Sequence, residues 1–155
     1  MSGQSESGVP TKIVVGTDGS VTAERAVHKA AALAKAVGAE LCIVSAFNDR
    51  GPAGVASTGF TVDAGWVAAA QGAAESVASD AAEKATALGV TSVSHQAVAG
   101  EPSEALIRVT EEQHADLLVV GSKGMQSTAR FLLGPIANKV SRKVDCDLLI
   151  VETSE

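Results

Sequence analysis

Three glycines in the last third of the chain are spaced so that the backbone around them could hold a phosphate group. Gly121, Gly124 and Gly134 follow the apolar run "ADLLVV" in the pattern Gly-x2-Gly-x9-Gly. Glycine lets backbone N–H groups turn toward a ligand without a Cβ in the way, and a helix N-terminus after the third glycine favours anions. Cations but no acids occupy this stretch, namely Lys123, Arg130, Lys139, Arg142 and Lys143. The stretch predicts an anion site, and the alternative is a flexible loop before a solvated basic helix.

A second loop with turn chemistry, Gly16 to Ser20, follows the apolar run Ile13 to Val15. In open parallel sheets, ligands bind beyond the carboxyl ends of the strands, where the strand order reverses. If the first and fourth strands are neighbours, this loop and the glycine-rich loop face one crevice. Asp18 in the first loop is then either a ligand contact or a cap for the following helix.

The sequence lacks the motifs of several enzyme classes. No G-x4-G-K-[ST] phosphate loop occurs, and the glycines are not the dinucleotide fingerprint, which belongs to a first turn. His28, His95 and His114 are scattered without metal-ligand spacing, and Ser20 and Ser122 are not in a G-x-S-x-G elbow. We therefore disfavour a metal site and a true hydrolase.

Alternating strand and helix patterns must position these loops. Ser20 is a plausible N-cap and Gly38 a natural stop for the first helix, and Pro102 suits the first turn of another. Strands are expected at 13–15, 40–47, 91–100, 115–121 and 147–151, and helices at 21–38, 66–89, 101–114 and from after Arg130 to about Lys143. Residues 48–65 form a long connection without a clear period. The alternation predicts a single α/β domain with a parallel sheet covered by helices on both faces.

Composition excludes several partners. The chain has 155 residues, of which 46% are apolar and 3% aromatic, with a net charge of −6. An acidic chain with few aromatic residues argues against nucleic acid, and no apolar window is long enough for a membrane span. Residues 1–10 are expected to be a disordered tail without a secretory pattern, so we expect a cytoplasmic protein. Cys42 and Cys146 are expected to be small buried hydrophobic residues.

Over residues 11–152 the sequence resembles the universal stress protein family. The resemblance rests on "VVGTDGS", "ADLLVVGSKG", "CDLLIV" and the glycine spacing. It implies a Rossmann-like, doubly wound domain over residues 11–155, with four helices and five strands in the order 3-2-1-4-5. It also implies that an adenine nucleotide (ATP, AMP or cyclic AMP, with Mg²⁺ left open) binds between the first and fourth strands. The protein is then a stress-response sensor or regulator, not an enzyme beyond slow ATP hydrolysis.

The resemblance also implies which residues contact the nucleotide. Asp18 matches the family's acidic residue near the nucleoside, and the end of the second strand matches the part that flanks adenine. The full expected set is Gly16, Thr17, Asp18, Ser45, Ala46, Val120, Gly121, Ser122, Lys123, Gly124, Gly134, Pro135, Ile136, Ala137 and Asn138.

One position departs from the family pattern. Binding members usually have Ser or Thr directly after the third glycine, whereas this chain has Pro135, which offers neither hydroxyl nor N–H. Ala137 replaces a second frequent hydroxyl. Asn138 or Lys123 could compensate, and a ligand with fewer phosphates would lose less. The alternative is a dimeric interaction module that has lost nucleotide binding.

The last strand, "DLLIV", predicts an assembly. In the order 3-2-1-4-5 it is an edge strand, and an apolar edge must be covered or paired. No proline or lysine lies between Asp147 and Glu155 to block it. We expect a homodimer through this strand, as the family resemblance also implies. The alternative is a monomer whose edge is masked by the N-terminal tail or the long loop.

Overall fold

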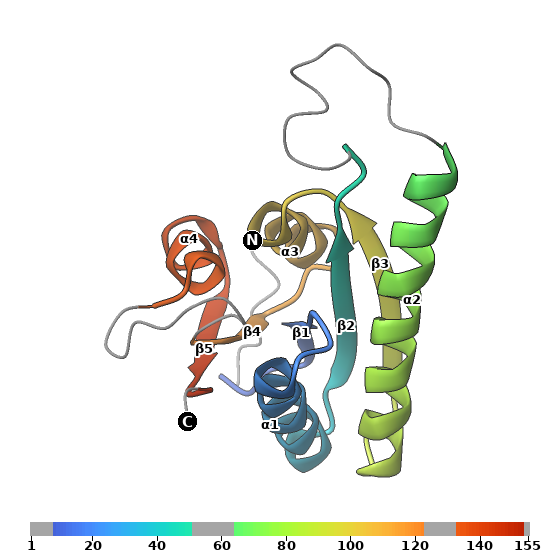
Figure 1. Ribbon diagram of the computed structural model, residues 1–155. Coiled ribbons are helices and arrows are strands. Elements are labelled where there is room, and N and C mark those ends of the chain that lie inside the picture. The colour runs from blue at the N-terminus through green and yellow to red at the C-terminus, as the bar shows by residue number, and fades with distance from the viewer. Residues whose placement is uncertain (1–7, 51–63, 123–132, 154–155) are drawn as a thin grey trace.

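A computed structural model describes residues 8–50, 64–122 and 133–153 (Figure 1). Strands and helices alternate along these ranges as β1 Lys12–Gly16, α1 Val21–Val37, β2 Glu40–Phe47, α2 Ala64–Ala87, β3 Val93–Ala99, α3 Pro102–Glu112, β4 Leu117–Gly121, α4 Pro135–Lys143 and β5 Asp147–Val151. All strand pairs are parallel, and the order is β3-β2-β1-β4-β5. The predicted doubly wound, Rossmann-like α/β fold is confirmed. Residues 1–7 of the expected tail and 51–63 of the long connection lie outside the described residues.

Two hydrophobic layers cover the sheet, one on each face. Alternate residues of a strand point to opposite faces, so Ile13 and Val15 of β1 pack under α1 and α2, while Val14 packs under α3 and α4. Figure 1 shows α1 and α2 on the opposite side of the sheet from α3 and α4. The middle of β1, Ile13 to Val15, is fully buried because the strand is central and covered on both faces.

Local signals in the sequence explain the helix ends. The hydroxyl of Ser20 accepts a hydrogen bond from the Ala23 N–H at 3.1 Å, as predicted for an N-cap. Gly38 ends α1 at φ 72°, a left-handed conformation that glycine adopts without strain. Pro102 occupies the first turn of α3, also as predicted.

Two predicted helix starts were wrong. Helix α2 begins at Ala64 rather than Trp66, because nothing in Ala64 opposes a helix. Helix α4 begins at Pro135 rather than just after Arg130. The residue before a proline is disfavoured in helical conformation, and Gly134 is extended at φ −63°, ψ 165°.

A buried carboxylate fixes the amino ends of β1 and β4. Asp116, 3% exposed, accepts hydrogen bonds from the Thr11 N–H at 2.8 Å, the Thr11 hydroxyl at 3.0 Å and the Lys12 N–H at 3.0 Å. Its own N–H donates to the Lys12 carbonyl at 3.1 Å. These bonds set the register of β1 on β4, and so hold the loops at the opposite strand ends side by side.

None of the described helices is both long and apolar enough to cross a membrane. Both cysteines are free thiols; Cys42 is buried, as predicted, whereas Cys146 is only half-buried.

Candidate functional site

A cavity of about 180 Å³ lies at the carboxyl ends of β1, β2 and β4. It opens where the strand order reverses, because β1 connects outward to β2 on one side and pairs with β4 on the other. Its walls come from the β1–α1 loop, the ends of β2 and β4, and the first turns of α3 and α4. The lining residues are Gly16, Thr17, Asp18, Val44, Ala46, Pro102, Leu106, Val120, Gly121, Gly134, Pro135, Ile136 and Ala137.

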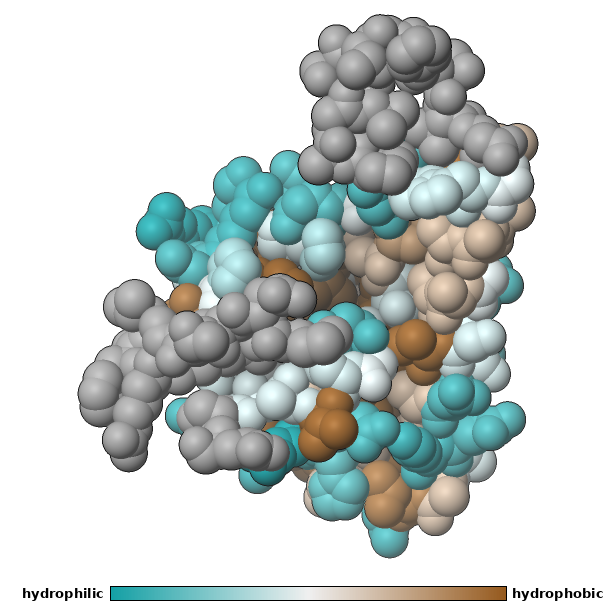
Figure 2. Space-filling model, in the orientation of Figure 1, coloured by the Kyte–Doolittle hydropathy of each residue, from teal (hydrophilic) through white to brown (hydrophobic). Residues whose placement is uncertain are grey.

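One half of the cavity is apolar. Val44 and Ala46 of β2 and Val120 of β4 point to the face covered by α3, and Leu106 of α3 lies opposite them. Figure 2 shows a hydrophobic recess beside the hydrophilic surface over α3. A flat, uncharged ring would suit these walls.

The β1–α1 loop forms a polar wall. The Thr17 N–H donates to the Val44 carbonyl at 2.9 Å, and the Thr17 hydroxyl accepts from the Gly19 N–H at 3.1 Å. Asp18 is exposed, and its Oδ1 accepts from the Ser20 N–H at 2.9 Å. Ser20, not Asp18, caps α1. The turn thus fixes the Asp18 carboxylate at the cavity, where it can accept hydrogen bonds from a ligand.

The N-terminus of α4 forms the opposite wall. The buried Gly134 N–H donates to the Ser122 carbonyl at 2.7 Å, which ties this glycine to the end of β4. Among the described residues no side chain caps α4, and Pro135 has no N–H. The partial positive charge of the helix N-terminus therefore faces the cavity, with the N–H groups of Ile136 and Ala137 as its donors.

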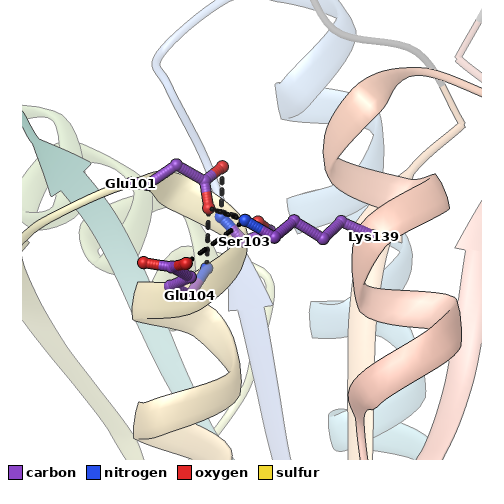
Figure 3. Close-up of polar contacts among 4 residues, drawn as sticks. All are labelled: Glu101, Ser103, Glu104 and Lys139. Atoms are coloured by element: carbon purple, nitrogen blue, oxygen red, sulfur yellow. Dashed lines mark hydrogen bonds and ion pairs between the residues drawn. The ribbon is translucent and has the colours of Figure 1, made fainter.

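An ion-pair cluster joins α3 to α4 beside the cavity (Figure 3). Glu101 accepts from the Ser103 N–H at 3.2 Å, the Glu104 N–H at 3.1 Å and the Ser103 hydroxyl. The Lys139 ammonium of α4 lies 3.2 Å from Glu101 Oε2 and 3.3 Å from Glu104 Oε1. Burial opposes ionisation of Glu101, but the hydrogen bonds from Ser103, Glu104 and Lys139 together lower its pKa to about 2. Hydrogen bonds to Glu101 and Glu104 raise the pKa of Lys139.

This cluster changes the interpretation of the basic stretch. Lys139 is committed to two carboxylates and is not a free cation at the cavity. Arg142 and Lys143 lie in the last turn of α4, away from its N-terminus. Lys123 and Arg130 lie outside the described residues. Within the part of α4 that faces the cavity, backbone donors rather than side-chain cations are therefore available to an anion.

The structure brings most of the predicted site residues together. Those that line the cavity are Gly16, Thr17, Asp18, Ala46, Val120, Gly121, Gly134, Pro135, Ile136 and Ala137. Lys123 and Gly124 lie outside the described residues.

Three predicted residues do not line it. Ser45 has the same parity along β2 as Ile43, so its side chain faces the α1 and α2 layer. Ser122 is engaged with the segment after β5, where its hydroxyl accepts from the Thr153 N–H at 3.1 Å. Asn138 is exposed on α4.

Sequence reasoning missed the contribution of α3. Pro102 and Leu106 line the cavity because α3 starts beside the carboxyl ends of the strands. The signal for Leu106 was its place one turn after Pro102, on the apolar face of α3. Nothing in the local sequence says that this face reaches the crevice.

The described residues contain no group of three or more His, Cys, Asp or Glu side chains that could hold a metal ion. Asp18 is the carboxylate that lines the cavity. The chemistry that this arrangement supports is binding through an apolar wall, one carboxylate and a helix N-terminus.

Several known proteins are similar to this chain in sequence, in fold or in both. The universal stress protein Rv1636 of Mycobacterium tuberculosis is 37% identical over 142 residues, which cover 92% of this chain and 96% of that protein. A universal stress protein solved in complex with cAMP is 34% identical, covers 94% of this chain and 99% of its own, and superposes with a TM-score of 0.70. UspA from Lactobacillus plantarum is 18% identical with a TM-score of 0.76, covering 91% and 97%, and shares the fold.

The family model "Universal stress protein family" matches residues 10–152, which is nearly the whole described structure. The chain belongs to the universal stress protein family.

Proposed function

We propose that the protein binds an adenine nucleotide in the cavity between the β1–α1 loop and α4, and acts as a stress-response sensor or regulator. The observation that carries the proposal is the cavity itself, which places an apolar wall, a carboxylate and an uncapped helix N-terminus around one space. The 34% identical relative whose crystal structure holds cAMP supports the choice of ligand.

In this proposal each wall has one role. Adenine packs between Val44, Ala46 and Leu106. The Asp18 carboxylate accepts hydrogen bonds from the ribose hydroxyls or the adenine amino group. The phosphate lies at the N-terminus of α4, near Gly121 and Gly134, where a glycine permits close approach of the backbone.

The charges that the described residues place around the cavity favour a ligand with one phosphate. A helix N-terminus carries roughly half an elementary charge, which suits a phosphate monoanion better than a triphosphate. Lys139 is already paired with two carboxylates, so those groups leave a net negative charge at the rim. Pro135 removes an N–H and a hydroxyl that could hold further phosphates. We therefore propose cyclic AMP or AMP over ATP, and Mg²⁺ has no carboxylate cluster to hold it among the described residues.

Calorimetry with cyclic AMP, AMP and ATP at millimolar concentration tests the proposal. We expect heat from the two monophosphates and weaker binding of ATP. Asp18→Asn should weaken binding by about tenfold, the effect of removing a charge-assisted hydrogen bond. Asp145→Asn, an exposed change at the opposite end of the sheet, is the matched control and should bind normally. Absence of heat with all three nucleotides would refute nucleotide binding and favour the interaction module that Pro135 and Ala137 suggest.

The sensor role and a cytoplasmic location are part of this proposal, and family membership supports them. We propose regulation through ligand binding rather than turnover, with slow ATP hydrolysis at most. A search by mass for nucleotide released from the denatured protein would identify the ligand that it carries in the cell.

We also propose a homodimer through β5. This strand is an edge of the sheet, and Leu148, Leu149 and Ile150 are only half-buried along it. Pairing with β5 of a second copy across a two-fold axis would extend the sheet and cover this edge. Light scattering at tens of micromolar should give the dimer mass, and Ile150→Pro, which removes an edge donor, should give the monomer. A native protein that stays monomeric would refute this assembly.

A further inference from the structure

A second cavity, of about 220 Å³, lies on the opposite face of the sheet between α1 and α2. It shares Thr17 with the nucleotide cavity, but its other walls are the facing sides of the two helices. Helix α1 contributes Val27 and α2 contributes Val77 and Ala81, so the inner surface is apolar. An apolar cavity of about 150 Å³ is known to accept a benzene ring, so this space is large enough for a small organic molecule.

The composition of α2 explains why the space stays open. Its buried positions are all alanine, including Ala78, Ala81 and Ala85. Small side chains let α2 pack closely on the sheet, but they do not reach across to α1. Val27 is 5% exposed and Ala81 8%, so the deepest part of the wall is buried, whereas Val77 is half-buried nearer the mouth.

Charged groups surround the mouth. Lys84 of α2 donates to Glu24 of α1 at 2.6 Å, which neutralises one carboxylate. Asp80 lies one turn before Lys84 and adds a second carboxylate to the same rim. The hydrogen bond and charge of Glu24 raise the pKa of Lys84, and the charge of Asp80 adds to this. The rim thus carries two carboxylates, Glu24 and Asp80, and one ammonium, Lys84, and His28 also lines the mouth. Figure 2 shows the same mixture of hydrophilic and hydrophobic surface over α1 and α2.

We propose that this cavity is a binding site for a small amphipathic amine. The apolar body enters between Val27, Val77 and Ala81, and the ammonium group stays at the rim beside Asp80 and Glu24. The apolar wall selects a hydrophobic body, and the surplus carboxylate selects a cation over a neutral or anionic head group. Thr17 lines both cavities, whereas the other walls of the two sites lie on opposite faces of the sheet.

Phenethylamine and its neutral counterpart 2-phenylethanol are suitable probes for calorimetry on the full-length protein. A ligand of this size is expected to bind with a Kd on the order of 1 mM. Asp80→Asn should weaken phenethylamine about threefold and leave 2-phenylethanol unchanged, as for a solvent-exposed charge pair. Glu83→Gln removes an exposed carboxylate from the same helix away from the cavity and should leave both affinities unchanged. Ala81→Leu fills the cavity and should weaken both probes at least tenfold.

Nuclear magnetic resonance on the native protein gives a second measurement that needs no variant. Amide shifts caused by phenethylamine should concentrate at Thr17, Val27, Val77 and Lys84. Shifts elsewhere, or no binding at a phenethylamine concentration ten times the expected Kd, would overturn the proposed site. Equal affinity for the amine and the alcohol, with no effect of Asp80→Asn, would overturn the assignment of an amine. Unchanged binding by a folded Ala81→Leu variant would overturn the placement in this cavity.

Discussion

Gly16, the last residue of β1, gives the sharpest test of the nucleotide cavity. A Cβ on Gly16 would lie 2.8 Å from Leu106 Cδ1 and 2.9 Å from Cδ2, which is closer than carbon atoms approach without a shift. Leu106 is 4% exposed and lies against the cavity, so the space open to its displaced side chain is the cavity itself. The change Gly16→Ala should therefore push Leu106 into the volume that the nucleotide occupies.

The magnitude follows from the packing. Overfilling a well-packed site costs about 1–3 kcal/mol, and the lower chain entropy of alanine in the unfolded state offsets about 0.5 kcal/mol of this. A chain of this length loses about 2–4 °C of Tm per kcal/mol, so the net cost of roughly 0.5–2.5 kcal/mol should lower the Tm by roughly 1–10 °C. Cyclic AMP affinity should fall about tenfold, because Leu106 takes part of a cavity of about 180 Å³.

Urea unfolding and calorimetry measure the two effects separately. Gly72→Ala is the matched control, because its Cβ would meet no atom within 4 Å and alanine favours a helix. It should raise stability by about 0.5–1 kcal/mol and leave binding unchanged. A Gly16→Ala protein with lower stability but native affinity would refute the placement of the ligand against Leu106. Unchanged stability would refute the contact itself.

Three further predictions rest on other contacts. Asp116→Ala should lower the free energy of unfolding by about 3 kcal/mol, because three part-buried hydrogen bonds from Thr11 and Lys12 lose their carboxylate acceptor. Glu112→Ala, an exposed change, should cost under about 0.5 kcal/mol in the same urea titration. Above pH 4.5, Glu101→Gln should be less stable than the native protein by about 1 kcal/mol after solvent screening. The difference should vanish as the pH falls toward 2, because the pKa of the Glu101 carboxyl is lowered from 4.5 to about 2 in the folded protein. A constant difference over that range contradicts the ion-pair explanation. Pro135→Ser should raise the affinity for ATP by about tenfold and the affinity for AMP by less, because it adds a hydroxyl and an N–H at the α4 N-terminus. Calorimetry measures both affinities, and equal gains would contradict the role of Pro135 in selectivity.

The hydrophobic pattern and the residues that cap helices predicted most of the fold. The apolar runs gave β1, β2, β4 and β5 their places, and Ser20 and Gly38 marked the ends of α1 because capping depends on local chemistry. The order of the strands came from the family resemblance, since alternation alone does not determine which strands are neighbours.

Contacts between distant residues explain what could not be predicted. Asp116 binds Thr11, 105 positions away in the sequence, and Lys139 pairs with Glu101, 38 positions away. The residues next to Asp116 and Lys139 in the sequence therefore do not indicate these contacts. Lys139 was counted with the free cations for that reason. The position of Ser45 was predictable, because strand alternation places it on the other face from Val44 and Ala46.

The central position of β1 has a consequence for synthesis on the ribosome. One edge of β1 pairs with β4, whose partner residues Leu117 to Val119 follow Ile13 to Val15 by 104 positions and are therefore synthesised later. Until then the nascent chain exposes the apolar run Ile13 to Val15 with one backbone edge unpaired by β4, and such edges bind other chains. At about 5–20 residues per second, this exposure lasts roughly 5–20 s in each round of translation. Growth conditions that slow elongation lengthen it, so yield of the folded protein should depend on chaperones that bind nascent chains.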